Sequence, residues 1–364
     1  MLSPRTKKNI SQIIPFALTW LLYSIVYSLL ERGLLGNLTH YPSTGNPYHF
    51  GTALLSAAIT ALVLGLVIGT LEILYINKLF TKKSFLKKLL YKTSIYLGVI
   101  ILFLLINRVI YNAVELKTSV FTPLVWTHTR QFFFNYVFLS VVVYITTVVG
   151  AALFYNEISQ NLGQGTLANF FTGKYHTPKE EQRIFMFLDM KSSTTIAESL
   201  GHVRYFEMLS EYYFDLSDPI INYSGQIYQY VGDEVVVSWK LKSVLENNNC
   251  IQCFFAMKET LGQQTTKYNE KFGVMPDFKA GFHLGKVTTG EIGVLKKDII
   301  FTGDVLNTTA RIQGLCNTYQ VDLLISADLL KELHLDPKFQ ILPLGENELR
   351  GRDEKVELFT ILQV

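Results

Sequence analysis

Apolar positions are distributed unevenly along this 364-residue chain. Most long apolar runs fall within residues 1–155, whereas residues 176–364 show the mixed pattern of an ordinary globular domain. A helix that crosses a bilayer needs about 20 mostly apolar residues, because about 30 Å of hydrocarbon must be spanned at about 1.5 Å per residue. Four segments meet this requirement: residues 13–30, 52–76, 95–114 and 132–155. The pattern predicts an N-terminal all-α membrane bundle of four transmembrane helices.

Lysine and arginine in the connections predict the orientation of these spans, since cytosolic loops are enriched in both. The N-terminus is basic, and so is the second connection; their residues are Arg5, Lys7 and Lys8, and Lys78, Lys82, Lys83, Lys87, Lys88 and Lys92. The connections at residues 31–50 and 115–131 carry one and two basic residues. We therefore expect a multi-pass protein of the inner (plasma) membrane whose termini and C-terminal domain are cytosolic.

Two ionisable residues lie inside or near the ends of the expected spans, Glu72 and Arg108. Such groups are expensive in the bilayer and are often functional. Because Glu72 lies near the end of its span, we expect an interfacial pair that extends to the lipid headgroups.

Composition supports the membrane prediction, because a chain that is 49% hydrophobic and only 17% charged is too apolar for an ordinary soluble protein. The net charge of +3 gives no reason to expect nucleic acid as a partner. Three cysteines, Cys250, Cys253 and Cys316, are too few for a disulfide framework and fit a reducing compartment. Cys250 and Cys253 lie in a run typical of a buried helix face, without partners at zinc spacing, so we expect no metal or redox role.

The character of the chain changes in residues 156–180, which are polar, contain three glycines and include Pro178. This composition is typical of a helix that leaves the membrane, a break and the start of a new domain. The expected organisation is a membrane domain at 1–155, a connecting segment at 156–180 and a second domain at 181–364. The connection either transmits a movement of the spans or is a passive tether.

The second domain shows alternating strand and helix patterns. A continuous apolar run at 183–189 predicts a buried strand, and Gly232 suits a tight hairpin. Further strands are expected at 226–231, 234–239, 278–284 and 286–292, and helices at 193–200, 202–223 and 250–272. The alternation predicts an α+β domain in which helices pack on one antiparallel sheet.

Four polar residues indicate chemistry in this domain. Asp189 ends the first strand and Asp233 follows the hairpin glycine, and two neighbouring carboxylates are costly unless a cation neutralises them. Asn307 and Arg311 are four residues apart in a helix that opens near Asp304, so they lie on one helix face. An amide and a guanidinium presented together suit an anionic transition state.

Three segments in order resemble the successive signatures of class III adenylate/guanylate cyclases. They are residues 187–194 (Phe-Leu-Asp-Met-Lys-Ser-Ser-Thr), 230–234 (Tyr-Val-Gly-Asp-Glu) and 303–312 (Gly-Asp-Val-Leu-Asn-Thr-Thr-Ala-Arg-Ile). The resemblance covers about residues 180–362, including a closing segment at 349–359. It implies a C-terminal α+β ferredoxin-like class III nucleotide cyclase domain.

The resemblance also implies roles for individual residues. Asp189 and Asp233 would hold two divalent cations, Mg²⁺ or Mn²⁺, with the Met190 carbonyl as an added ligand. Asn307 would orient the ribose, and Arg311 would stabilise charge on the α-phosphate.

The substrate's other phosphates have separate implied partners. Backbone N–H groups at a helix start, those of Ser192, Ser193 and Thr194, would cradle phosphates. Arg350 matches a position that usually holds a phosphate-binding lysine. In this family the metal residues and the Asn/Arg pair come from opposite subunits, so the resemblance implies a homodimer with shared active sites.

Base recognition departs from the family's patterns. Adenylate cyclases usually have a lysine where this chain has Gln229, and aspartate or threonine where it has Ile300; guanylate cyclases have glutamate and cysteine. Gln229 can both donate and accept hydrogen bonds, so adenine, guanine or a pyrimidine remains open. Asp298 is an alternative base-reading neighbour.

The expected function is a membrane-bound cyclase that converts a nucleoside triphosphate, with ATP favoured, to the 3′,5′-cyclic nucleotide and pyrophosphate for intracellular signalling. The alternatives are a cyclase for GTP or a pyrimidine nucleotide and a catalytically silent receptor or scaffold. A diguanylate cyclase is disfavoured, because Val231 precedes the single glycine of the turn.

Overall fold

A computed structural model describes residues 2–40, 47–80, 83–163, 165–241, 247–350 and 354–363. The chain divides into two compact units, here called the N-terminal unit (Thr6–Leu162) and the C-terminal unit (Gly163–Val364 with Met1–Arg5). The division falls inside the expected connecting segment 156–180. Lys82 and residues 351–353 of the closing segment lie outside the described residues.

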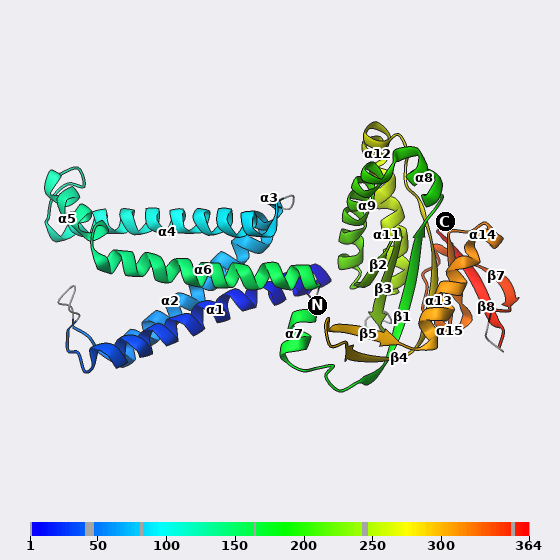
Figure 1. The fold of residues 1–364 in the computed structure, drawn as a ribbon, viewed down its shortest axis with the longest axis horizontal. Helices are drawn as coiled ribbons and strands as arrows, with labels where there is room; N and C mark the ends of the chain where they lie inside the picture. The colour runs from blue at the N-terminus through cyan, green and yellow to red at the C-terminus, as the bar shows by residue number, and fades with distance from the viewer. Residues whose placement is uncertain are drawn as a thin grey trace. The chain divides into compact units, whose positions relative to one another are not determined.

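The N-terminal unit is helical (Figure 1). Its helices are α1 (Pro4–Leu35), α2 (Phe50–Leu71), a π-helical turn (Glu72–Ile76), α3 (Asn77–Leu79), α4 (Phe85–Glu115), α5 (Pro123–Phe133) and α6 (Tyr136–Leu162). Four helical stretches are long and apolar enough to cross a membrane, namely Pro4–Leu35, Phe50–Leu79, Phe85–Glu115 and Phe138–Leu162. The predicted set of four long apolar helices is confirmed.

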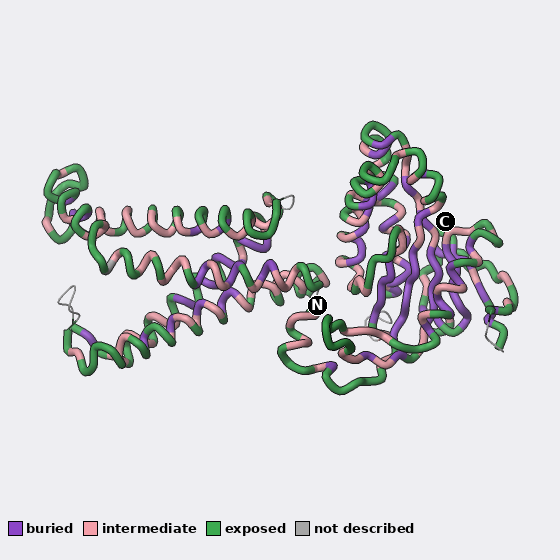
Figure 2. The backbone as a smooth tube through the Cα atoms, in the orientation of Figure 1, coloured by how far each residue is buried: buried purple, intermediate pink, exposed green. Residues whose placement is uncertain are grey.

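Burial in this unit differs from that of a soluble bundle (Figure 2). Large apolar side chains stay exposed along the long helices, for example Leu22 (60%), Phe103 (62%) and Val143 (57%). Contiguous exposed apolar surface of this kind is unfavourable in water and favourable against lipid. The exposure pattern therefore agrees with the membrane prediction.

The start of the fourth span differs from the expectation of residue 132. Phe132 and Phe133 belong to α5, a separate helix that begins at Pro123, and α6 begins only at Tyr136. The sequence predicted a connection at 115–131 because only Asn135 interrupts the apolar run that leads from residue 132 into α6.

Glu72 does not extend to the headgroups, so that expectation is wrong. Its side chain is fully buried, and Lys92 Nζ donates to Glu72 Oε1 (2.6 Å), to Glu157 Oε1 (2.7 Å) and to Asn77 Oδ1 (2.9 Å). Tyr96 donates to the other oxygen of Glu72 at 2.9 Å. All three protons of the lysine are therefore used, and the cluster ties the π-helical turn, α4 and α6 together.

Arg108 makes a different set of contacts from those expected. Its guanidinium lies over the rings of Tyr111 and Phe132, 5.3 Å and 5.1 Å from the ring centroids. The expected pairing of Glu72 with Arg108 is therefore wrong, because Lys92 is the cation beside Glu72.

The C-terminal unit mixes helices and strands. Its helices are α7 (Thr166–Phe171), α8 (Ser193–Leu200), α9 (His202–Asn222), α11 (Asn249–Gln263), α12 (Thr265–Phe272), α13 (Asp304–Gly314), α14 (Cys316–Tyr319) and α15 (Ala327–Leu330). Its strands are β1 (Lys179–Met190), β2 (Gln226–Val231), β3 (Glu234–Lys240), β4 (Phe278–Ile292), β5 (Asp298–Thr302), β6 (Leu323–Ser326), β7 (Phe339–Asn347) and β8 (Val356–Gln363).

The strands form one eight-stranded sheet in the order β2-β3-β1-β4-β6-β8-β7, with β5 paired to β4. The described pairings are antiparallel except that of β4 with β6. Side chains of β1 alternate between two cores: Ile184 and Met186 pack under α9 and α11, and Phe185 and Phe187 pack on the opposite face with Val305 of α13. Helices therefore cover both faces, with α13 on the face that carries Asp189 (Figure 1).

Most expected elements are confirmed, including the helices at 193–200 and 202–223 and the 226–239 hairpin, and the domain is α+β as predicted. The sheet, expected to be antiparallel, contains one parallel pairing, that of β4 with β6. Two expected element boundaries are also wrong. The strands expected at 278–284 and 286–292 are one continuous strand, β4, because β1 pairs with it on both sides of Gly285. The helix expected at 250–272 is interrupted at Gln264, which separates α11 from α12.

Candidate active site

The two aspartates lie at one end of the central strands. Asp189 is the second-last residue of β1, and Asp233 lies in the turn between β2 and β3. Because Leu188 pairs with Val235, the end of β1 lies beside this turn. Gly232 has a φ of +63°, the left-handed backbone that the turn requires and that glycine adopts at no steric cost.

The β2–β3 turn brings the charge of Asp233 close enough to Asp189 to affect its pKa. Burial raises the pKa of Asp189, and the nearby negative charge of Asp233 raises it further. The pKa of Glu234 is also raised, first by burial and then by the charges of Asp189 and Asp233. One carboxylate oxygen of Asp233, Oδ2, is buried without a hydrogen-bond partner. The turn therefore concentrates negative charge that a cation would stabilise.

Helix α9 supports this turn. The Tyr213 hydroxyl donates a hydrogen bond to the Gly232 carbonyl, and the Tyr213 ring packs 4.5 Å from that of Tyr230. Tyr213 thus holds the backbone that presents Asp233.

Two further residues reach Asp189 that sequence reasoning missed. Lys279 Nζ lies 3.4 Å from Asp189 Oδ2, and Gln313 Nε2 donates to the same oxygen at 3.3 Å. Lys279 is the direct cross-strand partner of Asp189 in the β1–β4 register. The charge of Lys279 partly offsets the increase in the pKa of Asp189.

Helix α13 approaches β4 closely because of a glycine. A Cβ atom at Gly281 would lie 2.4 Å from the backbone nitrogen of Gln313, a distance that no side chain tolerates. Asn307 and Arg311 lie on this helix one turn apart, as predicted. Asn307 is exposed, and Arg311 has a buried Nη1 without a hydrogen-bond partner. Within the described residues, neither forms a hydrogen bond or ion pair with Asp189 or Asp233.

The expected phosphate cradle lies directly after β1. Ser192 has a left-handed backbone, with a φ of +54°, and precedes the first turn of α8, which begins at Ser193 and contains Thr194. N–H groups in a first helical turn have no partner within the helix. Met190 is buried and pairs with Phe278, so its backbone position is fixed by the sheet.

The two expected base-facing positions lie on strands that contact each other. Gln229 is exposed on β2, beside a bulge, and Ile300 is half-buried on β5. Their neighbours Tyr228 and Phe301 pack with ring centroids 4.8 Å apart. Arg350 is exposed after β7, and in the described part of the chain it contacts none of the other candidate residues.

Cys250 and Cys253 are buried on α11, which confirms the predicted buried helix face, and Cys316 is buried on α14. Burial raises the pKa of the Cys250 thiol to about 12, which makes it a poor nucleophile.

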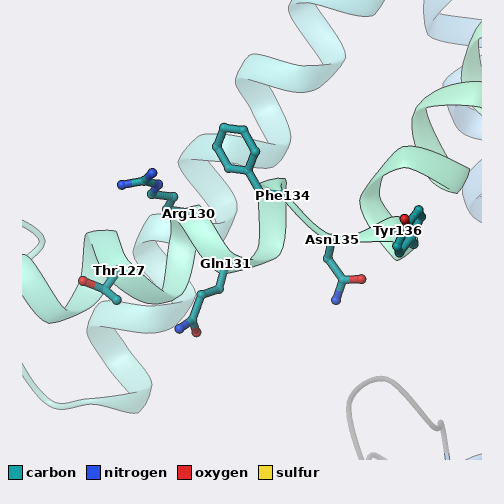
Figure 3. Close-up of a pocket in the computed structure, with 6 residues that line it drawn as sticks. All are labelled: Thr127, Arg130, Gln131, Phe134, Asn135 and Tyr136. Atoms are coloured by element: carbon teal, nitrogen blue, oxygen red, sulfur yellow. The ribbon is translucent and has the colours of Figure 1, made fainter.

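A cavity of about 560 Å³ lies elsewhere, between α5 and the start of α6 (Figure 3). It is an open hollow whose lining includes Arg130, Phe134 and Tyr136. None of the predicted site residues lines it, so it is not part of the candidate active site.

The aspartates fit a divalent cation in part. Asp233 offers an unpartnered oxygen, and carboxylates are the ligands that Mg²⁺ and Mn²⁺ prefer. Among the described residues, no group of three or more His, Cys, Asp or Glu side chains could hold a metal ion by itself. A cation at this position would therefore need water or substrate phosphate to complete its coordination.

Residues 176–363 match the model of the adenylate and guanylate cyclase catalytic domain. The chain belongs to this cyclase family. The matched range contains both aspartates, α13 and every other candidate residue.

Among curated cyclases, adenylate cyclase 2 of Rhizobium meliloti (strain 1021) is 35% identical over 223 residues, 61% of this chain and 61% of that protein. Adenylate cyclase 1 of the same organism is 26% identical over 185 residues, 49% of this chain and 27% of that protein. The chain thus spans less than two thirds of either relative. A solved bacterial light-regulated adenylyl cyclase superposes with a TM-score of 0.52 at 18% identity, covering 62% of this chain and 65% of that one, which supports the cyclase fold.

Proposed function

We propose that this chain is a membrane-bound adenylate cyclase that converts ATP to 3′,5′-cyclic AMP and pyrophosphate. The observation that carries the proposal is the convergence of Asp189 and Asp233, with one oxygen of Asp233 buried and unpartnered. Membership of the cyclase family and the 35% identity to an adenylate cyclase support the reaction and favour ATP.

In the proposed reaction, the substrate 3′-hydroxyl releases its proton to water and its oxygen forms a bond to the α-phosphorus. The bond from that phosphorus to the bridging oxygen breaks, and its electron pair leaves with pyrophosphate. Asp189, Asp233 and the Met190 carbonyl would hold two Mg²⁺ or Mn²⁺ ions, which lower the pKa of the 3′-hydroxyl and neutralise the leaving group.

The chain's own groups would position the substrate. The N–H groups of Ser192, Ser193 and Thr194 and the ammonium of Lys279 would bind phosphate oxygens. Asn307 would orient the ribose, and the guanidinium of Arg311 would stabilise the charge that develops on the α-phosphate. Arg350 would add a second phosphate contact, and Gln229 and Ile300 would face the base.

The active form we propose is a homodimer in which each site takes its aspartates from one copy and Asn307 and Arg311 from the other. Two observations on the described residues support it. Neither Asn307 nor Arg311 forms a hydrogen bond or ion pair with the aspartates of its own chain, and Nη1 of Arg311 is buried without a hydrogen-bond partner. The chain would lie in the plasma membrane through its four apolar helices, with both termini and the C-terminal unit in the cytosol.

The test is to incubate the purified full chain with each of ATP, GTP, CTP and UTP and Mn²⁺ and to identify the products by mass spectrometry. We expect cyclic AMP and pyrophosphate from ATP, and a smaller yield or none from the other nucleotides. Absence of any cyclic product would instead favour a silent receptor or scaffold, and a cyclic dinucleotide would favour a diguanylate cyclase.

A further inference from the structure

A buried polar network in the C-terminal unit has no part in the mechanism above. Its centre is Arg183 on β1, whose side chain is only 1% exposed. Alternation along β1 places Arg183 on the same face as Phe185, Phe187 and Asp189, six residues before the aspartate. A buried guanidinium is costly unless its N–H groups are hydrogen-bonded. Both terminal nitrogens of Arg183 have partners, and its buried Nε has none.

The guanidinium joins four strands. Its Nη1 donates to Glu181 Oε2 at 3.1 Å, and its Nη2 donates to Gln226 Oε1 at 2.7 Å and to Ser238 Oγ at 2.9 Å. Its carbon lies 4.5 Å from the ring centroid of Phe301. One side chain of β1 therefore holds the first residue of β2, a residue of β3 and the aromatic ring of β5.

Strands β2 and β5 are also joined directly beside the base-facing positions. The Phe301 backbone N–H donates to the Tyr228 hydroxyl at 3.3 Å. Tyr228 directly precedes Gln229 at the β2 bulge, and Phe301 directly follows Ile300. A shift of either strand would therefore move Gln229 or Ile300.

The other side of the network reaches the segment that precedes β1. Glu181 also accepts hydrogen bonds from the Tyr175 hydroxyl at 3.0 Å and from Thr289 at 3.4 Å. Burial alone would raise the pKa of Glu181, but the hydrogen bonds from Tyr175 and Arg183 outweigh it and lower the pKa. The carboxylate therefore stays ionised opposite Arg183.

The main effect of the Arg183 network is to fix the relative positions of its partners. Buried ion pairs contribute little net stability, because desolvation offsets the attraction. The rigid, planar guanidinium of arginine, in contrast, fixes several partners in set directions, which lysine does not do.

We propose that Arg183 is a positioning residue for nucleotide recognition, which holds β2 and β5 in the spacing that presents Gln229 and Ile300 to the base. The inference rests on the proposed cyclase function. It assigns Arg183 to substrate affinity and base preference, and not to the chemistry at the aspartates.

The test uses the full-length protein with Arg183→Met, Arg183→Lys and Tyr228→Phe, and with Lys267→Met as control. Lys267, on α12, donates to Asp215 of α9 at 2.7 Å, so neither residue belongs to β2 or β5. Steady-state kinetics are measured with ATP and with GTP. For Arg183→Met we expect KM for ATP to rise about tenfold, kcat to change less than about twofold, and the preference for ATP over GTP to shift. Arg183→Lys should fall between this variant and the wild type, and Lys267→Met should match the wild type.

The outcomes separate the two claims. A wild-type protein that makes no cyclic nucleotide overturns both the proposed function and this inference. An active wild type with unchanged KM and base preference in Arg183→Met, or with a loss confined to kcat, overturns this inference alone. If Arg183→Met does not fold, Tyr228→Phe decides: it removes one hydroxyl and keeps the ring, and kinetics equal to the wild type would count against the proposal.

Discussion

Lys279 Nζ lies 3.4 Å from Asp189 Oδ2, across the directly paired positions of β4 and β1. The lysine also donates to Asn317 at 2.9 Å, and its side chain is only 11% exposed. This cation lies beside the aspartate proposed to bind metal, which is why Lys279 is proposed as a phosphate-binding group.

Replacing Lys279 with methionine should weaken triphosphate binding, because a charged contact to phosphate is lost while most of the side-chain volume is kept. We expect KM for ATP to rise about tenfold, which corresponds to about 1.4 kcal/mol. Steady-state kinetics on Lys279→Met check this, with Lys338→Met as control, because Lys338 is 46% exposed and forms an ion pair only with Asp336 among the described residues. Equal KM values for the two variants would contradict the assignment.

Asp233→Asn should separate catalysis from stability. We expect activity to fall at least about a hundredfold, because the carboxylate proposed to hold cations loses its charge. Thermal stability should stay equal or rise, since the substitution removes a half-buried charge that lies close to Asp189. Product yield and a melting curve of the same preparation measure both; an active or strongly destabilised variant would refute this interpretation.

Lys92→Met should destabilise the N-terminal unit. Without this lysine, the buried carboxylates of Glu72 and Glu157 lose the ammonium group that pairs with both. Breaking a buried ion pair in this way costs about 3–5 kcal/mol. Lys88→Met is the control, because Lys88 reaches Glu157 only at 3.4 Å and Glu157 keeps its contact with Lys92, so a smaller loss is expected. Denaturant unfolding in detergent compares them. Equal losses would mean that the buried cluster does not hold the helices together.

Gly281→Ala should displace α13, because the new Cβ would lie 2.4 Å from the Gln313 nitrogen. We expect a loss of about 1–3 kcal/mol and a parallel fall in activity, as Asn307 and Arg311 move with the helix. Gly262→Ala, on α11 with nothing within 4 Å of its Cβ position, should instead be neutral or stabilising by about 1 kcal/mol. Full activity in Gly281→Ala would show that close packing of α13 on β4 is not required.

The sequence predicted the elements that depend on local pattern. The run ending at Asp189, the turn at Gly232 and the helix opening near Asp304 all have short-range signals, and the structure confirms each of these elements. The single strand β4 was missed because Gly285 resembles a break, whereas pairing with β1 continues through it.

Long-range contacts escaped prediction for a physical reason. Phe278 and Ala280 face the core under α9 and α11. Because side chains alternate along a strand, Lys279 between them could be placed on the opposite face of the sheet, which carries Asp189. Its pairing with Asp189 depends on the β1–β4 register, which no local signal sets. The burial of Lys92 was missed for the same reason. The sequence placed it among the basic residues of a connection, and only the packing of three helical segments shows that it is buried between carboxylates.

The central claim is a shared cyclase site, and complementation between two inactive variants tests it most directly. Asp189→Ala and Arg311→Ala are each expected to be inactive. The two variants are co-expressed with different tags, and hetero-dimers are purified. One of the two sites in each hetero-dimer should be intact, so the purified hetero-dimers should regain about half of wild-type cyclic AMP production and an unseparated random mixture about a quarter. Confirmed hetero-dimers that make no cyclic AMP, beside an active wild type, would contradict the account.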